Sequence, residues 1–254
     1  MLGGKTALIT GGAGDMGNEM AVHLAREGAG IVLWDLRPED QVTERIARVE
    51  AVGGPVIYQQ VDVTDRAAVD RALDRVVEQT GGVHIACINA GIVESAPFLE
   101  VSPELWQRHL DINLTGAFHV AQAVARVMVA RQIPGRLIFT STWVAEIPWP
   151  EITPYTVSKA GLNMLMKQAA RELAPYGIRA NAIAPGIVNA GLAGRQMRED
   201  PAYAARVAKV IPLGAPGTPV EIAQAVVYLA GPQTAYMTGS VLTLDGGCSL
   251  FQFD

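Results

Sequence analysis

Apolar and polar positions alternate along this chain in blocks, with short apolar runs separated by longer segments that have helical periodicity. The apolar runs have the length of β-strands, and the run at 84–88 is as apolar as the centre of a parallel sheet requires. The pattern therefore predicts strands at 6–10, 30–34, 56–61, 84–88, 136–141, 178–183 and 241–244.

The segments between these runs carry the apolar positions of helices. They predict helices at 18–27, 38–52, 66–80, 102–131, 155–173 and 220–229. No repeat, linker or low-complexity stretch divides the sequence, so we expect residues 1–254 to form one domain. Regular strand–helix alternation predicts the α/β class: a single doubly wound, Rossmann-like parallel sheet of about seven strands, with helices on both faces.

A glycine-rich turn joins the first predicted strand to the first predicted helix. Glycine permits a tight turn and a close approach of the backbone to a pyrophosphate, which binds at a helix N-terminus. We therefore expect a dinucleotide to contact Gly11, Gly14, Asp15, Met16 and Gly17.

An acidic residue, Asp35, ends the second predicted strand. A carboxylate about 20 positions beyond such glycines can bind both ribose hydroxyls of the adenosine half, and it repels a 2′-phosphate. Asp35 therefore favours NAD over NADP, and Arg37 close by can soften that preference. The alternative is that Asp35 only caps a helix or a turn.

A tyrosine and a lysine, Tyr155 and Lys159, stand four positions apart, so they share one face if the segment is helical. A fixed ammonium beside a phenol favours the phenolate and lowers the phenol pKa. The pair then suits general acid/base catalysis of an alcohol–ketone interconversion, with the Thr142 hydroxyl holding the reacting oxygen. The alternative is that the two side chains only share a helix face and have no catalytic role.

Four motifs occur in an order that resembles the short-chain dehydrogenase/reductase family. They are Thr10–Gly17, Asn89-Ala90-Gly91, Tyr155-Thr-Val-Ser-Lys159 and Pro185-Gly186. The resemblance runs from about Lys5 to Gly247, and Ile147-Pro-Trp-Pro150 is similar to the bacterial glucose 1-dehydrogenase branch.

The resemblance implies hydride transfer between a secondary alcohol, or a sugar hemiacetal, and NAD. Tyr155 would be the acid/base, Lys159 would lower its pKa and bind the nicotinamide ribose, and Thr142 would orient the substrate. Asn113 would hold a water that completes a proton relay from Lys159. The alternative for Asn113 is a surface residue or a kink at Gly116.

The resemblance also implies further cofactor contacts. The Asp62 carboxylate and the Val63 backbone would contact the adenine ring, although Asp62 or Thr64 can instead cap the helix that follows. Asn89 and Gly91 would lie beside the cofactor. The residues expected to line the nicotinamide are Pro185, Gly186 and Val188.

Two positions depart from the family pattern. Asp15 stands where the family usually has glycine, and its carboxylate can point outward and cap the helix. Thr142 stands where the family has serine, and Ser141 precedes it. Because side chains alternate along a strand, the register favours Thr142 as the residue that faces the substrate.

Composition excludes several other classes. The net charge of −5 and the lack of a basic patch argue against nucleic acid. No apolar run reaches the roughly 20 residues of a membrane span, and no signal peptide is evident, so we expect a cytoplasmic protein. Two cysteines and four histidines without ligand spacing predict no metal site.

Substrate and assembly follow from the resemblance. A sugar or polyol would need hydroxyl partners, for which the candidates are Glu94, Glu146, Glu151 and Asn189. The alternatives are a carbonyl or 3-oxoacyl reductase on a less polar ketone and, from another class, a non-catalytic nucleotide-binding regulator. We expect a substrate lid at about 189–212, a homotetramer paired through the helices at 102–131 and 155–173, and a tail at 248–254 that packs down or reaches a neighbouring subunit.

Overall fold

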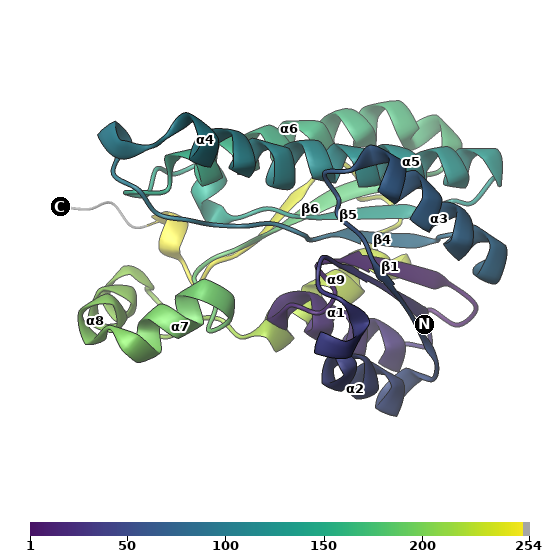
Figure 1. The fold of residues 1–254 in the computed structure, drawn as a ribbon, viewed down its shortest axis with the longest axis horizontal. Helices are drawn as coiled ribbons and strands as arrows, with labels where there is room; N and C mark the ends of the chain where they lie inside the picture. Colours follow the sequence, from purple (N-terminus) through teal and green to yellow (C-terminus); the bar gives the residue numbers. More distant parts are fainter. Residues whose placement is uncertain (251–254) are drawn as a thin grey trace.

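The computed structural model describes residues 1–250 and shows one parallel sheet (Figure 1). The strands lie in the order β3-β2-β1-β4-β5-β6-β7. Within the described residues they are β1 (Thr6–Thr10), β2 (Gly30–Asp35), β3 (Val56–Gln60), β4 (Ile85–Ile88), β5 (Arg136–Thr140), β6 (Arg179–Pro185) and β7 (Val241–Leu244). The predicted doubly wound, Rossmann-like fold is confirmed, and each predicted strand is present within a residue or two.

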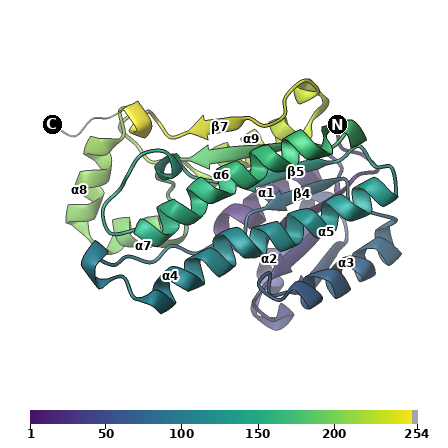
Figure 2. The ribbon, with the colours of Figure 1, turned by 90° about the horizontal axis from the view of Figure 1, so that it is seen from above.

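Helices cover both faces of this sheet (Figures 1 and 2). One face carries α1 (Asp15–Arg26), α2 (Thr43–Gly53) and α9 (Pro219–Ala230). The other carries α3 (Arg66–Thr80), α4 (Pro103–Leu110), α5 (Ala117–Ala130) and α6 (Thr153–Leu173).

The hydrophobic core is divided by the sheet into two clusters. Successive side chains of a strand point to opposite faces, so Leu8 packs in one cluster and Ile9 in the other. Val32 and Leu33 divide in the same way on β2. Burial on both faces explains why these strands read as continuous apolar runs in the sequence.

The order of the strands fixes where a ligand can bind. From β1 the chain winds outward to β2 and β3, and then returns to the other side of β1 as β4. The crossovers therefore diverge between β1 and β4, which leaves a crevice at the carboxyl ends of these strands. The glycine-rich turn that follows β1 lies at this end of the sheet.

Two predicted segments differ from expectation. The helix expected at 102–131 is divided into α4 and α5 by a wide π-helical turn, Asp111–Gly116, which contains Asn113. The segment expected to form a lid at 189–212 contains α7 (Gly191–Glu199) and α8 (Pro201–Val210). Figure 2 shows both helices beyond the ends to which the strand arrows point.

The C-terminal tail is described in part. Its first residues, Cys248–Leu250, form a 3₁₀ turn in which Cys248 is buried. The two tail alternatives concern mainly residues 251–254, which lie outside the described part of the chain.

Candidate active site

A cavity of about 500 Å³ lies at the carboxyl ends of β1 and β4. Its wall includes every predicted cofactor-binding residue: Gly11, Gly14, Asp15, Met16, Gly17, Asp35, Asp62, Val63, Asn89, Gly91, Tyr155, Lys159, Pro185, Gly186 and Val188. The glycine turn has the close packing of a dinucleotide-binding turn, because a Cβ on Gly17 would lie 2.2 Å from the Gly11 carbonyl oxygen and only glycine lets the start of α1 pack on the turn.

The Asp35 carboxylate is held at the edge of this cavity, at the end of β2. It accepts a hydrogen bond from the Ala13 N–H at 3.0 Å and pairs with the Arg37 guanidinium at 3.0 Å. Burial raises the pKa of Asp35, but the hydrogen bonds from Arg37 and Ala13 outweigh it and leave the pKa below its ordinary value. Asp35 is therefore anionic at neutral pH, and its charge is partly balanced by Arg37.

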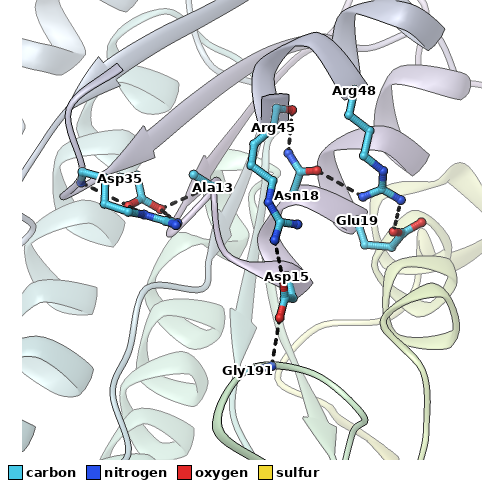
Figure 3. A network of polar contacts seen from close by, with 9 residues as sticks. Ala13, Asp15, Asn18, Glu19, Asp35, Arg45, Arg48 and Gly191 are labelled. Carbon is cyan, nitrogen blue, oxygen red and sulfur yellow. Dashed lines mark hydrogen bonds and ion pairs between the residues drawn. The ribbon is translucent and has the colours of Figure 1, made fainter. Parts of the chain in front are cut away.

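The Asp15 carboxylate joins three segments (Figure 3). One oxygen accepts a hydrogen bond from Arg45 of α2 at 2.7 Å, and the other accepts one from the Gly191 N–H at 3.0 Å. Chiefly through the Gly191 bond, the pKa of Asp15 is lowered. The expectation that Asp15 caps α1 is wrong: Gly14 is the N-cap residue, and the Asp15 side chain faces the start of α7 instead.

Tyr155 and Lys159 project from the first turns of α6 into the cavity wall, as their spacing predicted. The Lys159 Nζ lies 5.8 Å from the centre of the Tyr155 ring and donates to the Thr140 carbonyl at 2.7 Å. Burial lowers the pKa of Lys159 to about 8.

The pKa of Tyr155 is raised rather than lowered. Its burial raises the pKa, and a hydrogen bond with the Thr142 side chain lowers it by less. The expectation of a lowered Tyr155 pKa rested on the Lys159 ammonium alone and left out the loss of water around the phenol. At neutral pH Tyr155 is therefore a neutral phenol, the form that donates a proton.

Thr142 and Ser141 follow the end of β5 and differ in what they contact. Both line the cavity, but Thr142 also lines the adjoining second cavity and reaches Tyr155. The Ser141 Oγ is buried and has no hydrogen-bond partner within residues 1–250. The geometry favours Thr142, in agreement with the register argument.

Asn113 lies behind the cavity wall rather than in it. It is fully buried, and its side chain both accepts from the Ile92 N–H at 2.8 Å and donates to the Ile92 carbonyl at 2.9 Å. It also donates to the Ser158 Oγ at 3.1 Å. A Cβ on Gly91 would lie 3.0 Å from Asn113 Oδ1 and 3.4 Å from Lys159 Nζ, so only glycine leaves these groups close together. The surface alternative for Asn113 is wrong, whereas the helix is indeed interrupted at the π-helical turn that ends at Gly116.

Three supporting residues were missed from the sequence. The Thr10 hydroxyl accepts from the N–H groups of Asn89 and Ala90 at 2.9 and 3.0 Å. The Thr140 carbonyl holds Lys159, and the Ser158 hydroxyl links Asn113 to the Tyr155 carbonyl. Only Thr10 gave a signal, as the first residue of the glycine motif.

At the predicted adenine end of the cavity, the structure excludes the helix-capping role considered for Asp62 or Thr64. The Asp62 carboxylate accepts from the backbone and the hydroxyl of Thr64, at 2.9 and 2.7 Å. The N-cap of α3 is Asp65, whose carboxylate accepts from the Ala68 N–H at 3.0 Å. Neither Asp62 nor Thr64 caps that helix, so Asp62 and Val63 are left as part of the cavity wall.

A second cavity of about 520 Å³ adjoins the first and shares Thr142 and Tyr155 with it. Its wall is notably aromatic: the rings of Trp143 and Trp149 meet edge to face at 5.3 Å, and Tyr203 of α8 lies on the same wall. Of the four predicted hydroxyl partners for a sugar, Glu151 alone is among the described lining residues.

The other three predicted hydroxyl partners lie elsewhere in the described chain. Glu94 forms an ion pair with Arg108, and Glu146 and Asn189 are not in the wall of either cavity. Other polar side chains, among them Ser95, Gln196 and Asp200, line the second cavity in their place.

Residues 1–250 contain no cluster of three or more His, Cys, Asp or Glu side chains that could hold a metal ion. In the same range, every helix is too short or too polar to cross a bilayer.

Comparison with known proteins gives consistent matches over nearly the whole chain. Residues 11–249 match the family model described as enoyl-(acyl carrier protein) reductase. The chain is 38% identical to 3beta-hydroxysteroid dehydrogenase 1 of Eggerthella lenta, over 98% of this chain and 95% of that protein.

Two solved structures are similar in fold and sequence. A short-chain type dehydrogenase/reductase from Mycobacterium marinum superposes with a TM-score of 0.89 and 35% identity, over 98% of this chain and 96% of the other. An NAD⁺-bound xylitol dehydrogenase superposes with a TM-score of 0.92 and 33% identity, over 97% and 99% of the two chains.

Proposed function

Because the chain belongs to the short-chain dehydrogenase/reductase family, we propose that it is an NAD-preferring oxidoreductase that interconverts a secondary alcohol and a ketone. One observation carries the proposal. Tyr155 and Thr142 line both the dinucleotide-sized cavity and the adjoining aromatic cavity, so they stand where a cofactor and a substrate would meet. Lys159 lies beside them in the first cavity.

The bound nicotinamide would supply the hydride acceptor or donor. This chain's own residues move the proton: Tyr155 donates it as the phenol to the carbonyl oxygen in reduction, and takes it as the phenolate from the hydroxyl in oxidation. Thr142 orients that oxygen through its hydroxyl. Lys159 stays close to the phenol and stabilises its ionised form. Asn113 holds the backbone of Ile92 and so fixes the neighbouring Gly91, beside which Lys159 lies. The proposed proton relay runs from Lys159 through a water held by Asn113.

NAD is the proposed cofactor because Asp35 is anionic at the end of β2, where a 2′-phosphate would meet its charge. The NAD⁺-bound state of the similar xylitol dehydrogenase supports the same choice. The Arg37 guanidinium covers the Asp35 carboxylate, so NADP would be bound more weakly rather than excluded.

The substrate we propose is a secondary alcohol attached to an apolar ring or chain. Trp143, Trp149 and Tyr203 give the second cavity an aromatic surface against which such a ring can pack, and the similarity to a 3beta-hydroxysteroid dehydrogenase supports the choice. Polar side chains, among them Ser95 and Gln196, line the same cavity and could pair with hydroxyls. The less polar alternative from the sequence is therefore the leading one, and a sugar or polyol, as in the xylitol dehydrogenase, is the second candidate.

The test is cofactor reduction by the purified protein with NAD⁺ or NADP⁺, over matched panels of cyclic secondary alcohols, polyols and aldoses. We expect turnover of cyclic alcohols with NAD⁺ preferred, and loss of turnover in Tyr155→Phe with NAD⁺ binding retained. Turnover of sugars alone would overturn the substrate proposal. A protein that binds NAD⁺ and turns over no alcohol or ketone would favour the non-catalytic regulator.

The organisation of the chain adds three further proposals. We propose that residues 1–254 act as one domain, that α7 and α8 form a lid over the substrate, and that the protein is a cytoplasmic homotetramer. The lid proposal is supported by the position of Tyr203 and Ala193 in the wall of the second cavity.

A further inference from the structure

An arginine of the proposed lid is held between two aromatic rings at the second cavity. The Arg206 guanidinium carbon lies 5.3 Å from the centre of the Trp149 ring and 5.4 Å from that of Tyr203. Tyr203 is one turn earlier on α8, whereas Trp149 belongs to the loop before α6. All three residues line the cavity that also contains Tyr155 and Thr142.

Among the described residues, this guanidinium has no carboxylate partner. Within residues 1–250, no Asp or Glu oxygen lies within ion-pair distance, 4.0 Å, of the Arg206 nitrogens. Stacking on aromatic rings satisfies the faces of a guanidinium but leaves its N–H donors, which lie in its plane, free for another group. Arg206 is also exposed, so its donors are accessible from the cavity mouth.

Two acidic residues share the cavity wall and must be weighed. One oxygen of the Asp200 carboxylate caps α8 by accepting from the N–H groups of Ala202 and Tyr203 at 2.9 and 3.1 Å. This fixes the side chain but leaves it, like Glu151, as an acidic group that opposes an anion in the cavity. Glu151 is exposed and forms no ion pair within the described chain. It opposes an anion in the cavity without neutralising Arg206.

We propose that Arg206 binds a carboxylate on the substrate, at the end remote from the reacting carbon. The proposal rests on the proposed function, because it deepens the substrate class of the same site. A guanidinium is planar, and its N–H groups can form two parallel hydrogen bonds to a carboxylate. The substrate would then be a hydroxy acid, with its alcohol at Tyr155, its apolar body against the tryptophans and its carboxylate at Arg206.

The test measures binding to the NADH-loaded protein by calorimetry, with 2-naphthoate and its neutral counterpart 2-naphthamide as probes. Wild type is expected to bind the naphthoate about tenfold or more tightly than the amide. In Arg206→Gln the ratio of the two affinities should fall to about one, and Arg206→Lys should give an intermediate ratio, because it keeps the charge and loses the planar fork.

Two further variants separate this site from general charge effects. Lys209→Gln removes a cation from the same helix at a residue outside the described cavity wall, and it should keep the wild-type ratio. Glu151→Gln should raise the affinity for naphthoate and not for the amide, because it removes a negative charge from the cavity wall.

The proposal is overturned if wild type binds the two probes equally or binds neither, or if the ratio survives in Arg206→Gln. The outcome does not depend on turnover. A protein that prefers naphthoate but oxidises no alcohol keeps the anion site and loses the proposed function. A protein that oxidises neutral cyclic alcohols and shows no preference keeps the function and loses the anion site.

Discussion

At the scale of single residues, burial decides how Lys159 behaves. A pKa lowered from 10.5 to about 8 corresponds to roughly 3 kcal/mol of unfavourable free energy for the charged side chain in the folded protein. The folded state binds fewer protons than the unfolded state between these two values. The free energy of unfolding therefore rises with pH through this window, and the buried charge destabilises the folded protein most below pH 8.

Replacement of Lys159 by Met is therefore expected to abolish turnover and to stabilise the protein by about 1–3 kcal/mol at pH 7. The gain should shrink as the pH rises from 8 to 10.5, where wild type no longer carries a buried charge. Denaturant unfolding of both proteins at pH 7 and pH 10 measures this. An equal difference at the two pH values would show that the ammonium is not destabilising.

The hydroxyls of Thr142 and Ser141 give a matched pair. Thr142→Ala is expected to lower kcat at least a hundredfold, because it removes the hydroxyl that reaches Tyr155 and the substrate oxygen. Ser141→Ala should keep kcat within about threefold, since it removes a hydroxyl without a partner in the described residues. Steady-state kinetics decides between them, and the reverse pattern would refute the assigned geometry.

Arg37 is expected to set how strict the cofactor choice is. Removing its guanidinium in Arg37→Ala leaves the Asp35 charge unbalanced and takes away a cation that can bind a 2′-phosphate. The ratio of kcat/KM for NAD⁺ to that for NADP⁺ should rise about tenfold. Asp35→Ser provides the opposite control, with a ratio that falls. An Arg37→Ala ratio equal to that of wild type would mean that Arg37 takes no part in the choice.

The residue scale also shows where sequence reasoning stops. The Tyr155–Lys159 pair is visible as a spacing, because four positions on a helix define a shared face. The direction of the Tyr155 pKa is not, because it depends on how much water the folded wall excludes. The contact of Asn113 with Ile92 joins segments that only packing brings together.

At the scale of elements, the strands were predictable and several helix ends were not. Apolar runs buried on both faces give a strong signal, as on β1 and β2. The π-helical turn at 111–116 gives a weak one, because Asn113 and Gly116 are poor helix formers in a segment that otherwise keeps its helical periodicity. The helices α7 and α8 were also missed, since small and polar residues dominate their sequence.

The contact between the glycine turn and α7 is expected to hold the lid in place. Asp15→Gly restores the usual family residue but removes the bonds to Gly191 and Arg45. KM for the alcohol should rise about threefold to tenfold, and proteolysis within 189–212 should become faster. Arg45→Gln should have a smaller effect, because the Gly191 bond remains.

A neighbouring arginine is the control for this change. Arg48 lies on the same helix α2, and it pairs with Glu19 and Asn18 rather than with Asp15 (Figure 3). Arg48→Gln should therefore leave KM and the cleavage pattern as in wild type. If all three variants behave alike, the effect belongs to α2 as a whole and not to the Asp15 contact.

At the scale of the whole molecule, the exposed apolar side chains on α5 and α6 bear on assembly. Phe118, Val157 and Met164 are 40%, 42% and 59% exposed and lie on the two helices predicted to pair between subunits. If the proposed tetramer pairs through these helices, Met164→Glu is expected to give a smaller species at micromolar concentration, because it would bury a charge in that interface. Light scattering after size-exclusion chromatography measures the mass.

Val52 supplies the matched control, since it is a similarly exposed apolar residue on α2. Val52→Glu should leave the mass unchanged. A wild-type protein that is monomeric at these concentrations would contradict the tetramer proposal directly.

The edge strand β7 has a consequence for how the protein becomes active during its synthesis. It pairs with β6 and accepts a hydrogen bond from Gly186, and a Cβ on that glycine would lie 2.5 Å from the Asp245 Cα. One wall of the first cavity therefore depends on the strand of this sheet that is synthesised last. A nascent chain can fold its first four strands early, yet it cannot complete the cavity until β7 has left the ribosome.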